Sequence, residues 1–331
     1  MSNYHIYGIG AALVDTEIEV NDADLQSFNI EKGVMTLVDE PRQKQLLELL
    51  SEHLVASKRA SGGSAANSII AASYFGAKTF YSCKVANDEN GAFYLTDLEN
   101  ANVEYHAHNG SKTGTTGKCL VMITPDAERT MNTFLGISES LSEDEIDIEA
   151  LKKSDYAYIE GYLVTSETGR PAAIKLHQLA KEFGVKTAVS LSDPAIVEFF
   201  HAGLQEMIGD GVDILFCNEH EALQYTKTES LEAAIESLKA IAKSFAITLG
   251  AKGALVFDGT DSHNIDAHPV KAIDTNGAGD MFAGAFLYAL SQGKSYKEAG
   301  QLASKAASVV VSQFGPRLRA EQHQEILKSV D

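Results

Sequence analysis

The chain has 331 residues, of which 44% are hydrophobic and 8% aromatic, and it carries a formal net charge of −19. This composition predicts a folded globular protein, either one large α/β core with an appendage or two domains, and excludes a disordered chain. The negative charge argues against nucleic acid or an anionic membrane surface as the main partner, because both require a basic stripe. An anionic substrate would have to be held by local backbone amides, a metal ion and a few placed cations.

The three cysteines, Cys83, Cys119 and Cys217, are widely spaced and form no CxxC or Cys/His pattern. They predict buried thiols in a reducing compartment and no structural zinc. The chain has neither a basic leader followed by an apolar stretch nor a run of ~18 apolar residues. We therefore expect a cytoplasmic protein without a membrane segment.

The N-terminal part predicts a strand followed by an inserted β region. Residues 4–10 form an apolar run that ends in a glycine turn, which is typical of a buried strand. Between residues 14 and 40, the segments 16–20 and 34–38 alternate in polarity, which predicts half-exposed antiparallel strands packed over the main sheet. Residues 103–135 return to short β segments. The sequence thus predicts one domain over residues 1–331, with a small lid formed by insertions at about 14–40 and 103–135.

The rest of the chain alternates between helices and strands. Helices are predicted at 41–55, from Ser64, at 166–183, 194–208, 230–243 and 277–291, with two more after Ser295. Strands are predicted at 79–85, 156–162, 186–191, 214–218, 246–249 and 254–257. This alternation indicates a mostly parallel, doubly wound sheet.

The strongest motif is Asp274-Thr275-Asn276-Gly277-Ala278-Gly279-Asp280, which directly precedes an apolar helix. Small residues at 277–279 let backbone amides approach a phosphate at a helix N-terminus, so the segment predicts an anion hole. An acid at its mouth can accept the proton of an attacking hydroxyl, which makes Asp280 the candidate base. The alternative is a plain glycine turn that ends in an acidic helix start.

Two other nucleotide-binding patterns fail on spacing. After Gly8-Ile9-Gly10, Leu13 stands where a dinucleotide fingerprint requires its third glycine. Gly293-Lys294-Ser295 has the ending of a P-loop, but Tyr288 occupies the position of its first glycine.

Polar side chains follow several of the predicted strands or stand at the start of predicted helices. Asn218 and Glu221 lie three residues apart on one helix face and could hold a hydrated Mg²⁺, or simply be an N-cap and a first-turn acid. Asn67 lies one turn after the pair Gly62-Gly63, an arrangement suited to a polar substrate or to an ordinary capped helix. Asp15 could bind vicinal hydroxyls, because a carboxylate accepts two hydrogen bonds, or it could be solvated.

With these residues in place, the chain resembles the ribokinase (PfkB) family of carbohydrate kinases over nearly its whole length. The segments 62–67 and 274–280 match the two signatures of that family. The adenosine kinase-like branch is the most similar, through Lys32-Gly33 with Met35–Asp39 and through Asp126-Ala127-Glu128-Arg129-Thr130. The resemblance implies a three-layer α/β/α sandwich with a small β-rich lid and an ATP-dependent, Mg²⁺-dependent phosphotransferase.

The resemblance also implies roles for matching positions. Those implied for the acceptor site are Asp15, Gly63, Ser64 and Asn67. Those implied for MgATP are Asn218, Glu221, Thr248, Gly250 and Gly253. Those implied for phosphoryl transfer are the base Asp280, the anion-hole residues Gly277, Ala278 and Gly279, and Arg129, which reaches the transferred phosphate. The resemblance further suggests a monovalent cation such as K⁺ before Asp280, and a monomer.

At one position the sequence differs from the adenosine kinase-like branch. Adenosine kinases usually carry Asn directly after the first Gly-x-Gly, where this chain has Ala11. The change removes a hydrogen bond worth roughly 1 kcal/mol near the nucleoside. Adenosine is the expected acceptor, and the alternatives are another nucleoside such as inosine or guanosine, a free sugar such as ribose or fructose, or a non-catalytic nucleoside- or nucleotide-binding regulator.

Overall fold

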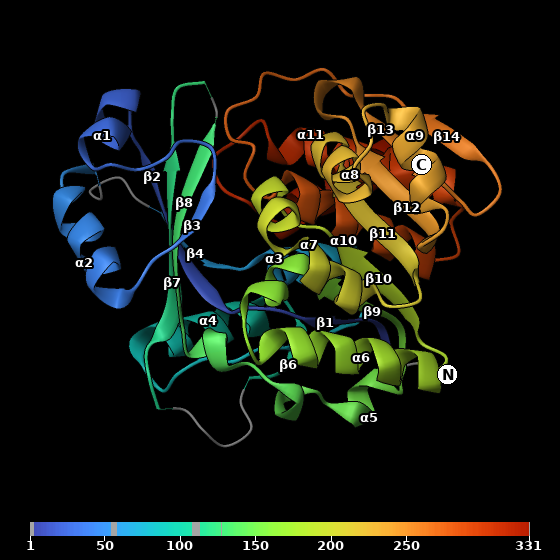
Figure 1. The fold of residues 1–331 in the computed structure, drawn as a ribbon, viewed down its shortest axis with the longest axis horizontal. Helices are drawn as coiled ribbons and strands as arrows, with labels where there is room; N and C mark the ends of the chain where they lie inside the picture. The colour runs from blue at the N-terminus through green and yellow to red at the C-terminus, as the bar shows by residue number, and fades with distance from the viewer. Residues whose placement is uncertain (1–2, 54–57, 108–112, 127, 331) are drawn as a thin grey trace.

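The computed structural model describes residues 3–53, 58–107, 113–126 and 128–330. Its strands form a large sheet of nine strands and a separate sheet of five. In Figure 1 the small sheet stands upright on the left, beside the helices and strands of the large domain. The cleft that holds the candidate site lies between these two parts.

The large sheet runs in the order β14-β13-β12-β11-β10-β9-β1-β5-β6. Its strands are β1 (Tyr4–Ile9), β5 (Thr79–Ser82), β6 (Val103–His106), β9 (Ser154–Glu160), β10 (Lys186–Ser190), β11 (Val212–Asn218), β12 (Ala242–Thr248), β13 (Ala254–Phe257) and β14 (Ser262–Ile265). The strands from β6 to β12 pair in parallel, and β13 and β14 are added antiparallel at one edge. This mostly parallel sheet was predicted from the alternation of helices and strands.

Helices cover both faces of this sheet. One core packs α3 (Ser64–Phe75), α10 (Ala278–Ser291), α11 (Tyr296–Val310) and α12 (Ala320–Val330) against the sheet, and the other packs α6 (Gly169–Phe183), α7 (Pro194–Ile208), α8 (Glu219–Thr226) and α9 (Leu231–Leu238). Neighbouring strand residues alternate between the two cores: Ile6 belongs to the first and Tyr7 to the second. Because both faces are buried, the strands are continuous apolar runs. The three-layer α/β/α sandwich is thereby confirmed.

The small sheet has the order β3-β8-β7-β2-β4. Its strands are β2 (Leu13–Glu19), β3 (Met35–Leu37), β4 (Lys58–Gly62), β7 (Thr116–Ile123) and β8 (Arg129–Gly136). The expected antiparallel pairing is wrong in part, because β2 pairs in parallel with β7 and β3 with β8. The half-exposed strand expected at 16–20 is also largely buried: β2 is a central strand, and one of its faces is covered by α1 (Asp22–Ser27) and α2 (Glu40–Leu49).

Some predicted boundaries differ from the structure. Residues 103–106 fall within the expected lid insertion but extend the large sheet, because β6 pairs with β5. The helix predicted at 230–243 ends at Leu238, and β12 starts at Ala242. The turn 239–241 has no glycine or proline to signal this end. Residues 108–112 and 127 of the expected insertion lie outside the described residues.

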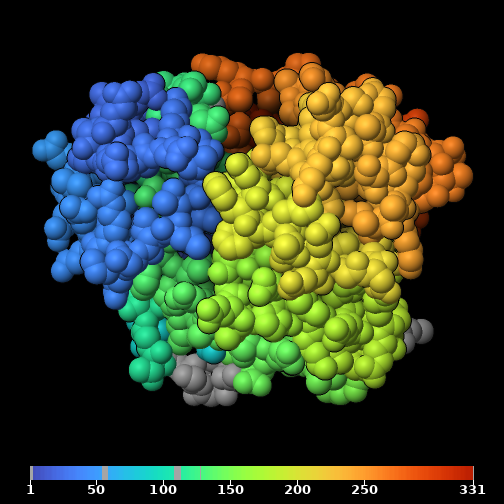
Figure 2. Space-filling model, in the orientation of Figure 1, coloured from blue at the N-terminus to red at the C-terminus, as the bar shows by residue number. Residues whose placement is uncertain are grey.

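None of the helices in the described part of the chain is long and apolar enough to cross a membrane. Two further α-helices also pack on the large sheet: α4 (Glu89–Asn100) contributes Tyr94 and Leu98 to the first core, and α5 (Ile148–Leu151) contributes Ala150 and Leu151 to the second. Figure 2 shows the blue N-terminal segments of the small-sheet part packed against the yellow segments of the large domain. The two parts therefore touch along the cleft.

Candidate active site

A cavity of about 410 Å³ lies where the small sheet meets the carboxyl ends of the large-sheet strands. Its walls include Glu160 at the end of β9, Asn218 at the end of β11 and Thr248 at the end of β12. Parallel α/β sheets bind their ligands at this edge, because the loops that follow the strands converge there. The candidate site residues that line the cavity are Asp15, Gly63, Ser64, Asn67, Arg129, Asn218, Glu221, Thr248, Gly277, Ala278, Gly279 and Asp280.

Asp280 lies in the first turn of α10, with both carboxylate oxygens held by α3. The hydroxyl of Ser64 donates to Oδ1 at 2.6 Å, and the amide of Asn67 donates to Oδ2 at 3.0 Å. Burial raises the pKa of Asp280, whereas these two hydrogen bonds and the nearby Arg129 lower it. Oδ1 of Asn67 is buried without a hydrogen-bond partner among the described residues, so it can accept a bond from a ligand. Ser64 and Asn67 thus orient the base as well as border the cavity.

The N-terminus of α10 forms the candidate anion hole. Gly277 is its N-cap, and no side chain caps the helix. The Ala278 N–H donates to the Thr275 carbonyl at 3.3 Å, and the other N–H groups of the first turn are left for a ligand. Gly277 has φ +73°, and a Cβ there would overlap Pro316, so this position requires glycine. A Cβ on Gly279 would meet no described atom within 4 Å. That open space allows a phosphate to approach the backbone closely.

Asp15 is buried on β2, with its carboxyl group packed against Gly62. A Cβ on Gly62 would overlap the carboxyl group, which explains the first glycine of the pair. Burial, and then the nearby Glu17, raise the pKa of Asp15 well above its ordinary value, and Arg317 opposes this rise. Oδ1 of Asp15 has no hydrogen-bond partner among the described residues. It is therefore available to a substrate hydroxyl.

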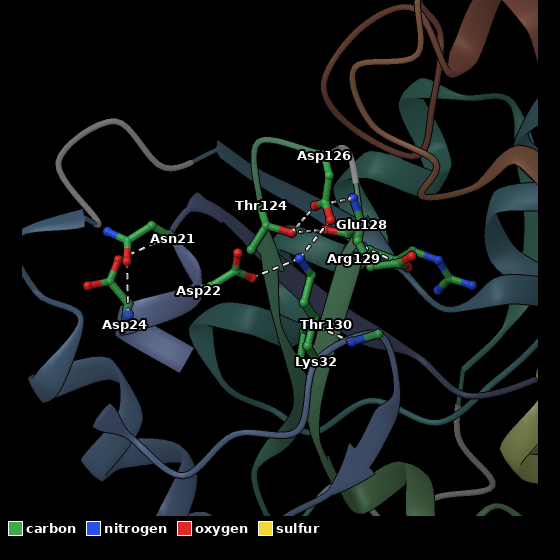
Figure 3. A network of polar contacts seen from close by, with 10 residues as sticks. Asn21, Asp22, Asp24, Lys32, Thr124, Asp126, Glu128, Arg129 and Thr130 are labelled. Carbon is green, nitrogen blue, oxygen red and sulfur yellow. Dashed lines mark hydrogen bonds and ion pairs between the residues drawn. The ribbon is translucent and has the colours of Figure 1, made fainter. Parts of the chain in front are cut away.

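Arg129 is the first residue of β8, in the small sheet. The turn before it is held by Lys32, which forms ion pairs with Asp22 at 2.8 Å and with Asp126 at 2.7 Å. In Figure 3 the guanidinium of Arg129 points away from Lys32 and Asp126. Although burial lowers it, the pKa of Arg129 is raised by the nearby Tyr162 of the large domain, which favours the charged form. The small sheet thus contributes a cation to the site as well as the carboxyl group of Asp15.

Comparison with known proteins shows the family. The family model described as pfkB family carbohydrate kinase matches residues 47–323 of this chain. The chain belongs to the pfkB family. An adenosine kinase of Schizophyllum commune is 27% identical over 347 residues, covering 96% of this chain and 98% of that protein. A chain from an adenosine kinase structure of Sinorhizobium meliloti is 31% identical, with a TM-score of 0.91, covering 99% of this chain and 100% of that one. A probable sugar kinase of Rhizobium etli is 30% identical with a TM-score of 0.93, and the match covers 100% of both chains.

Membership of the pfkB family makes this protein a phosphotransferase with an alcohol group as acceptor. Its relatives include proteins named adenosine kinase, as the resemblance suggested. The family implies ATP as phosphoryl donor together with Mg²⁺. The uncapped helix N-terminus at Gly277 fits the phosphates of such a donor.

The candidate Mg²⁺ pair of this pfkB protein is also a helix cap. Oδ1 of Asn218 accepts from the Glu221 backbone at 2.8 Å, while Glu221 accepts from the backbone and the side chain of Asn218 at 2.9 and 2.6 Å. Burial raises the pKa of Glu221 to about 7. No group of three or more His, Cys, Asp or Glu side chains in the described residues could hold a metal directly. The pair therefore fits a hydrated Mg²⁺ bound through water.

The two glycines expected at the nucleotide site lie in the turn between β12 and β13, outside the residues that line the cavity. Gly250 begins a short 3₁₀ helix with φ +57° and is followed, after that helix, by Gly253 with φ +94°. A Cβ on Gly253 would overlap the Ile265 carbonyl. Their positive φ angles explain why glycine occupies both positions. Thr248 is the residue of this segment that lines the cavity.

Glu160 is a pocket residue that the sequence analysis of this pfkB protein missed. It is 1% exposed, and its two oxygens accept from the backbone N–H groups of Ala11 and Ala65, each at 2.7 Å. Burial raises its pKa to about 7, although these two hydrogen bonds lower it. The strand predicted at 156–162 included Glu160, whereas β9 ends there; an acid directly before Gly161 was the available signal for this end.

Proposed function

We propose that this protein transfers the γ-phosphate of ATP to the 5′-hydroxyl of adenosine. The observation that carries the proposal is the carboxylate of Asp280, held by Ser64 and Asn67 beside the uncapped N-terminus of α10. A base next to an anion hole is the arrangement that phosphoryl transfer to a hydroxyl requires.

In the proposed reaction, Asp280 accepts the proton of the 5′-hydroxyl while that oxygen forms a bond to the γ-phosphorus. The bond from the γ-phosphorus to the bridging oxygen breaks, and ADP leaves with that oxygen. The N–H groups at 277–279 and the guanidinium of Arg129 stabilise the charge on the transferring group. Closure of the small sheet as a lid would exclude water, and so suppress ATP hydrolysis.

A nucleoside is the preferred acceptor because the small sheet gives the cavity an apolar wall. The wall residues are Leu13, Met35, Leu37, Met131 and Leu135. Methionine and leucine side chains suit the face of an aromatic base, whereas a free sugar would leave this wall without an apolar partner. Asp15, with Oδ1 free, suits the vicinal hydroxyls of the ribose.

Bound Mg²⁺ would neutralise charge on the donor phosphates, and Asn218 and Glu221 would hold it through water. Thr248, with the turn at Gly250 and Gly253, would support the nucleotide. A monovalent cation such as K⁺ near the segment before Asp280 belongs to the same proposal.

The proposal includes a cytoplasmic monomer that binds no nucleic acid. Three free cysteines, all buried, suit a reducing compartment. α1 and α2 cover one face of the small sheet through Leu25, Leu46 and Leu50, so this face is closed to a second copy. Gel filtration with light scattering tests the monomer, which a mass twice that of the chain would contradict.

A coupled assay of ADP release tests the function. Full-length protein with MgATP is measured against adenosine, inosine, guanosine, cytidine, ribose and fructose, with Asp280→Asn as the control. We expect the highest kcat/KM with adenosine. A preference for another acceptor would replace the substrate and keep the chemistry. Nucleotide binding without turnover on any acceptor would contradict the kinase assignment and favour a regulator.

A second acceptor class has one observation in its favour. Ala11 lines the cavity where the related kinases usually carry Asn, so a hydrogen bond to the base is absent at that point. Inosine or guanosine, which differ from adenosine at the purine edge, are therefore the alternative acceptors. The acceptor panel distinguishes them directly.

A further inference from the structure

The side chain of Glu160 joins two segments of the site that are far apart in the chain. Its Oε1 accepts from the backbone N–H of Ala11 and its Oε2 from that of Ala65, each at 2.7 Å. Ala11 lies in the turn between β1 and β2, and Ala65 lies in the first turn of α3. A single buried carboxyl group thus connects the strand that carries Asp15 to the helix that holds Asp280.

The N-terminus of α3 receives its cap from Glu160. The N-cap residue of this helix is Gly63, which makes no side-chain hydrogen bond. The N–H of Ala65 is one of the first-turn groups that have no partner within the helix, and a negative charge beside them is favourable. The same turn carries Ser64, whose hydroxyl donates to Asp280 at 2.6 Å. The position of this turn therefore sets the position of the base.

Ala11 is held through both of its backbone groups. Its N–H donates to Glu160, and its carbonyl oxygen accepts from the Tyr81 hydroxyl at 3.0 Å. A Cβ on Gly63 would lie 2.3 Å from that carbonyl oxygen, and a Cβ on Gly10 would overlap the carboxyl group of Glu160. The two glycines thus allow the turn, the start of the helix and the carboxyl group to lie in direct contact.

The two N–H groups favour an ionised carboxyl group at this position. A carboxylate accepts through both oxygens, whereas a glutamine would accept through one and turn an amino group towards the other N–H. Burial raises the pKa of Glu160 to about 7, while the hydrogen bonds from Ala11 and Ala65 lower it and the nearby Asp280 raises it. Hydrogen bonds to a charged acceptor are stronger than neutral ones, so the two bonds offset part of the cost of burying the charge.

We propose that Glu160 is a positioning residue for phosphoryl transfer: by holding Ala11 and the first turn of α3 together, it sets the place of the base Asp280 relative to the acceptor strand β2. Glu160 acts through Ser64, whose neighbour it binds, and accepts no proton from the acceptor. A shift of about 1 Å in a reacting group can cost about a hundredfold in rate. The kinetic effects rest on the proposed function, whereas the two contacts do not.

The first experiment needs no acceptor. NMR follows hydrogen exchange of the Ala11 and Ala65 N–H groups in full-length protein at pH 8, above the pKa of Glu160. In Glu160→Gln we expect exchange at one or both positions to accelerate about tenfold. Glu229→Gln, at an exposed position, is the matched control and should leave both rates unchanged. Unchanged exchange at both positions in Glu160→Gln overturns the proposal, whatever the acceptor is.

The second experiment measures kcat and KM in the coupled ADP-release assay at pH 8. We expect Glu160→Gln to lower kcat about tenfold and to leave the KM for ATP within about twofold of wild type. The reason is that Glu160 bonds to the β1–β2 turn and to α3, and not to the phosphate-binding turn. A raised KM for adenosine with unchanged kcat would show a direct contact with the acceptor and overturn the proposal. A large rise in the KM for ATP would show a merely structural role and also overturn it.

A double-mutant cycle tests the route of the effect. If Glu160 acts through Ser64, Glu160→Gln should lower kcat by no more than about threefold in the Ser64→Ala background, because the contact that it positions is already lost. An undiminished tenfold loss in that background would show that the two residues act independently and would overturn the proposal.

Failure of the proposed function gives a different pattern. Wild-type protein would then turn over none of the acceptors, and the role in phosphoryl transfer would fall with it. The exchange rates at Ala11 and Ala65 would still decide whether Glu160 holds the two segments together. If Glu160→Gln does not fold, as judged by circular dichroism, Glu160→Asp takes its place in all three measurements. It keeps the charge but is one methylene shorter, so it cannot reach both N–H groups.

Discussion

The amide of Asn67 donates a hydrogen bond to Oδ2 of Asp280 at 3.0 Å, although the two residues are 213 positions apart in the chain. The contact joins the first turns of α3 and α10, which lie side by side on one face of the large sheet. It fixes the carboxylate in one orientation at the mouth of the anion hole.

Asp280→Asn should lower kcat by about a thousandfold, because the variant keeps the shape of the carboxylate but cannot accept the hydroxyl proton. Binding of acceptor and ATP should change little. The coupled ADP-release assay measures kcat, and calorimetry measures binding. Asp261→Asn, at an exposed position in the β13–β14 turn, is the matched control. Near-normal turnover in Asp280→Asn would refute its role as base.

Ser64→Ala should reduce kcat about tenfold and move the acidic limb of the pH–rate profile to higher pH. The Ser64 hydroxyl lowers the pKa of Asp280, so its removal leaves more of the base protonated at a given acidic pH. Burial also raises the pKa values of Glu160 and Glu221 to about 7, and these two groups are present in both the variant and the wild type. The comparison therefore rests on the shift between variant and wild type, and an unmoved limb would contradict the hydrogen bond.

Gly277→Ala and Gly279→Ala should fail in different ways. At Gly277, positive φ and the overlap with Pro316 predict a loss of about 1–3 kcal/mol in unfolding free energy together with lost activity. At Gly279 a methyl group meets open space and improves helix propensity, so stability should be kept while phosphate binding is blocked. Urea unfolding and ATP kinetics separate the two effects. Unchanged kcat/KM for ATP in Gly279→Ala would argue against the anion hole.

Leu135→Ala should raise the KM for adenosine about tenfold and leave the KM for ribose unchanged. The substitution removes apolar surface from the small-sheet wall, on which only a base can pack. Leu49→Ala is the control, since Leu49 is 46% exposed on α2 and does not line the cavity. A similar rise in the KM for adenosine and for ribose would indicate that the substitution disturbs the lid and does not remove a contact with the nucleobase.

His323→Phe should reduce the decrease in the free energy of unfolding that occurs as the pH falls below 6.5. Burial against Phe75 and Tyr74 lowers the pKa of His323 to about 4, so the unfolded chain binds the proton more readily than the folded protein does. Wild type should therefore lose up to about 3 kcal/mol through this residue as the pH falls from 6.5 to 4. Urea unfolding at several pH values measures the difference. His220→Gln, at an exposed position, should keep the wild-type slope.

Much of the fold follows from local signals. Apolar strands bounded by glycine, and helices with recognisable starts such as Asp39-Glu40-Pro41, indicate an alternating α/β chain. The pairing within the small sheet was predicted less well. The parallel partner of β2 is the distant strand β7, in which Gly117 lies opposite Leu13. Alternation of polarity does not encode the direction of a distant partner.

The sequence by itself determined which segments could bind a phosphate: small residues at 277–279 before an apolar helix, with Asp280 beside them. It also carried the pair Asn218 and Glu221, whose spacing is a local helix property. Only the tertiary structure decided which side chains meet Asp280 and Asp15. The order of strands in the large sheet brings α3 beside α10, and the turn at Arg317 beside α4. These contacts join residues more than 200 positions apart, and no local periodicity or spacing specifies them.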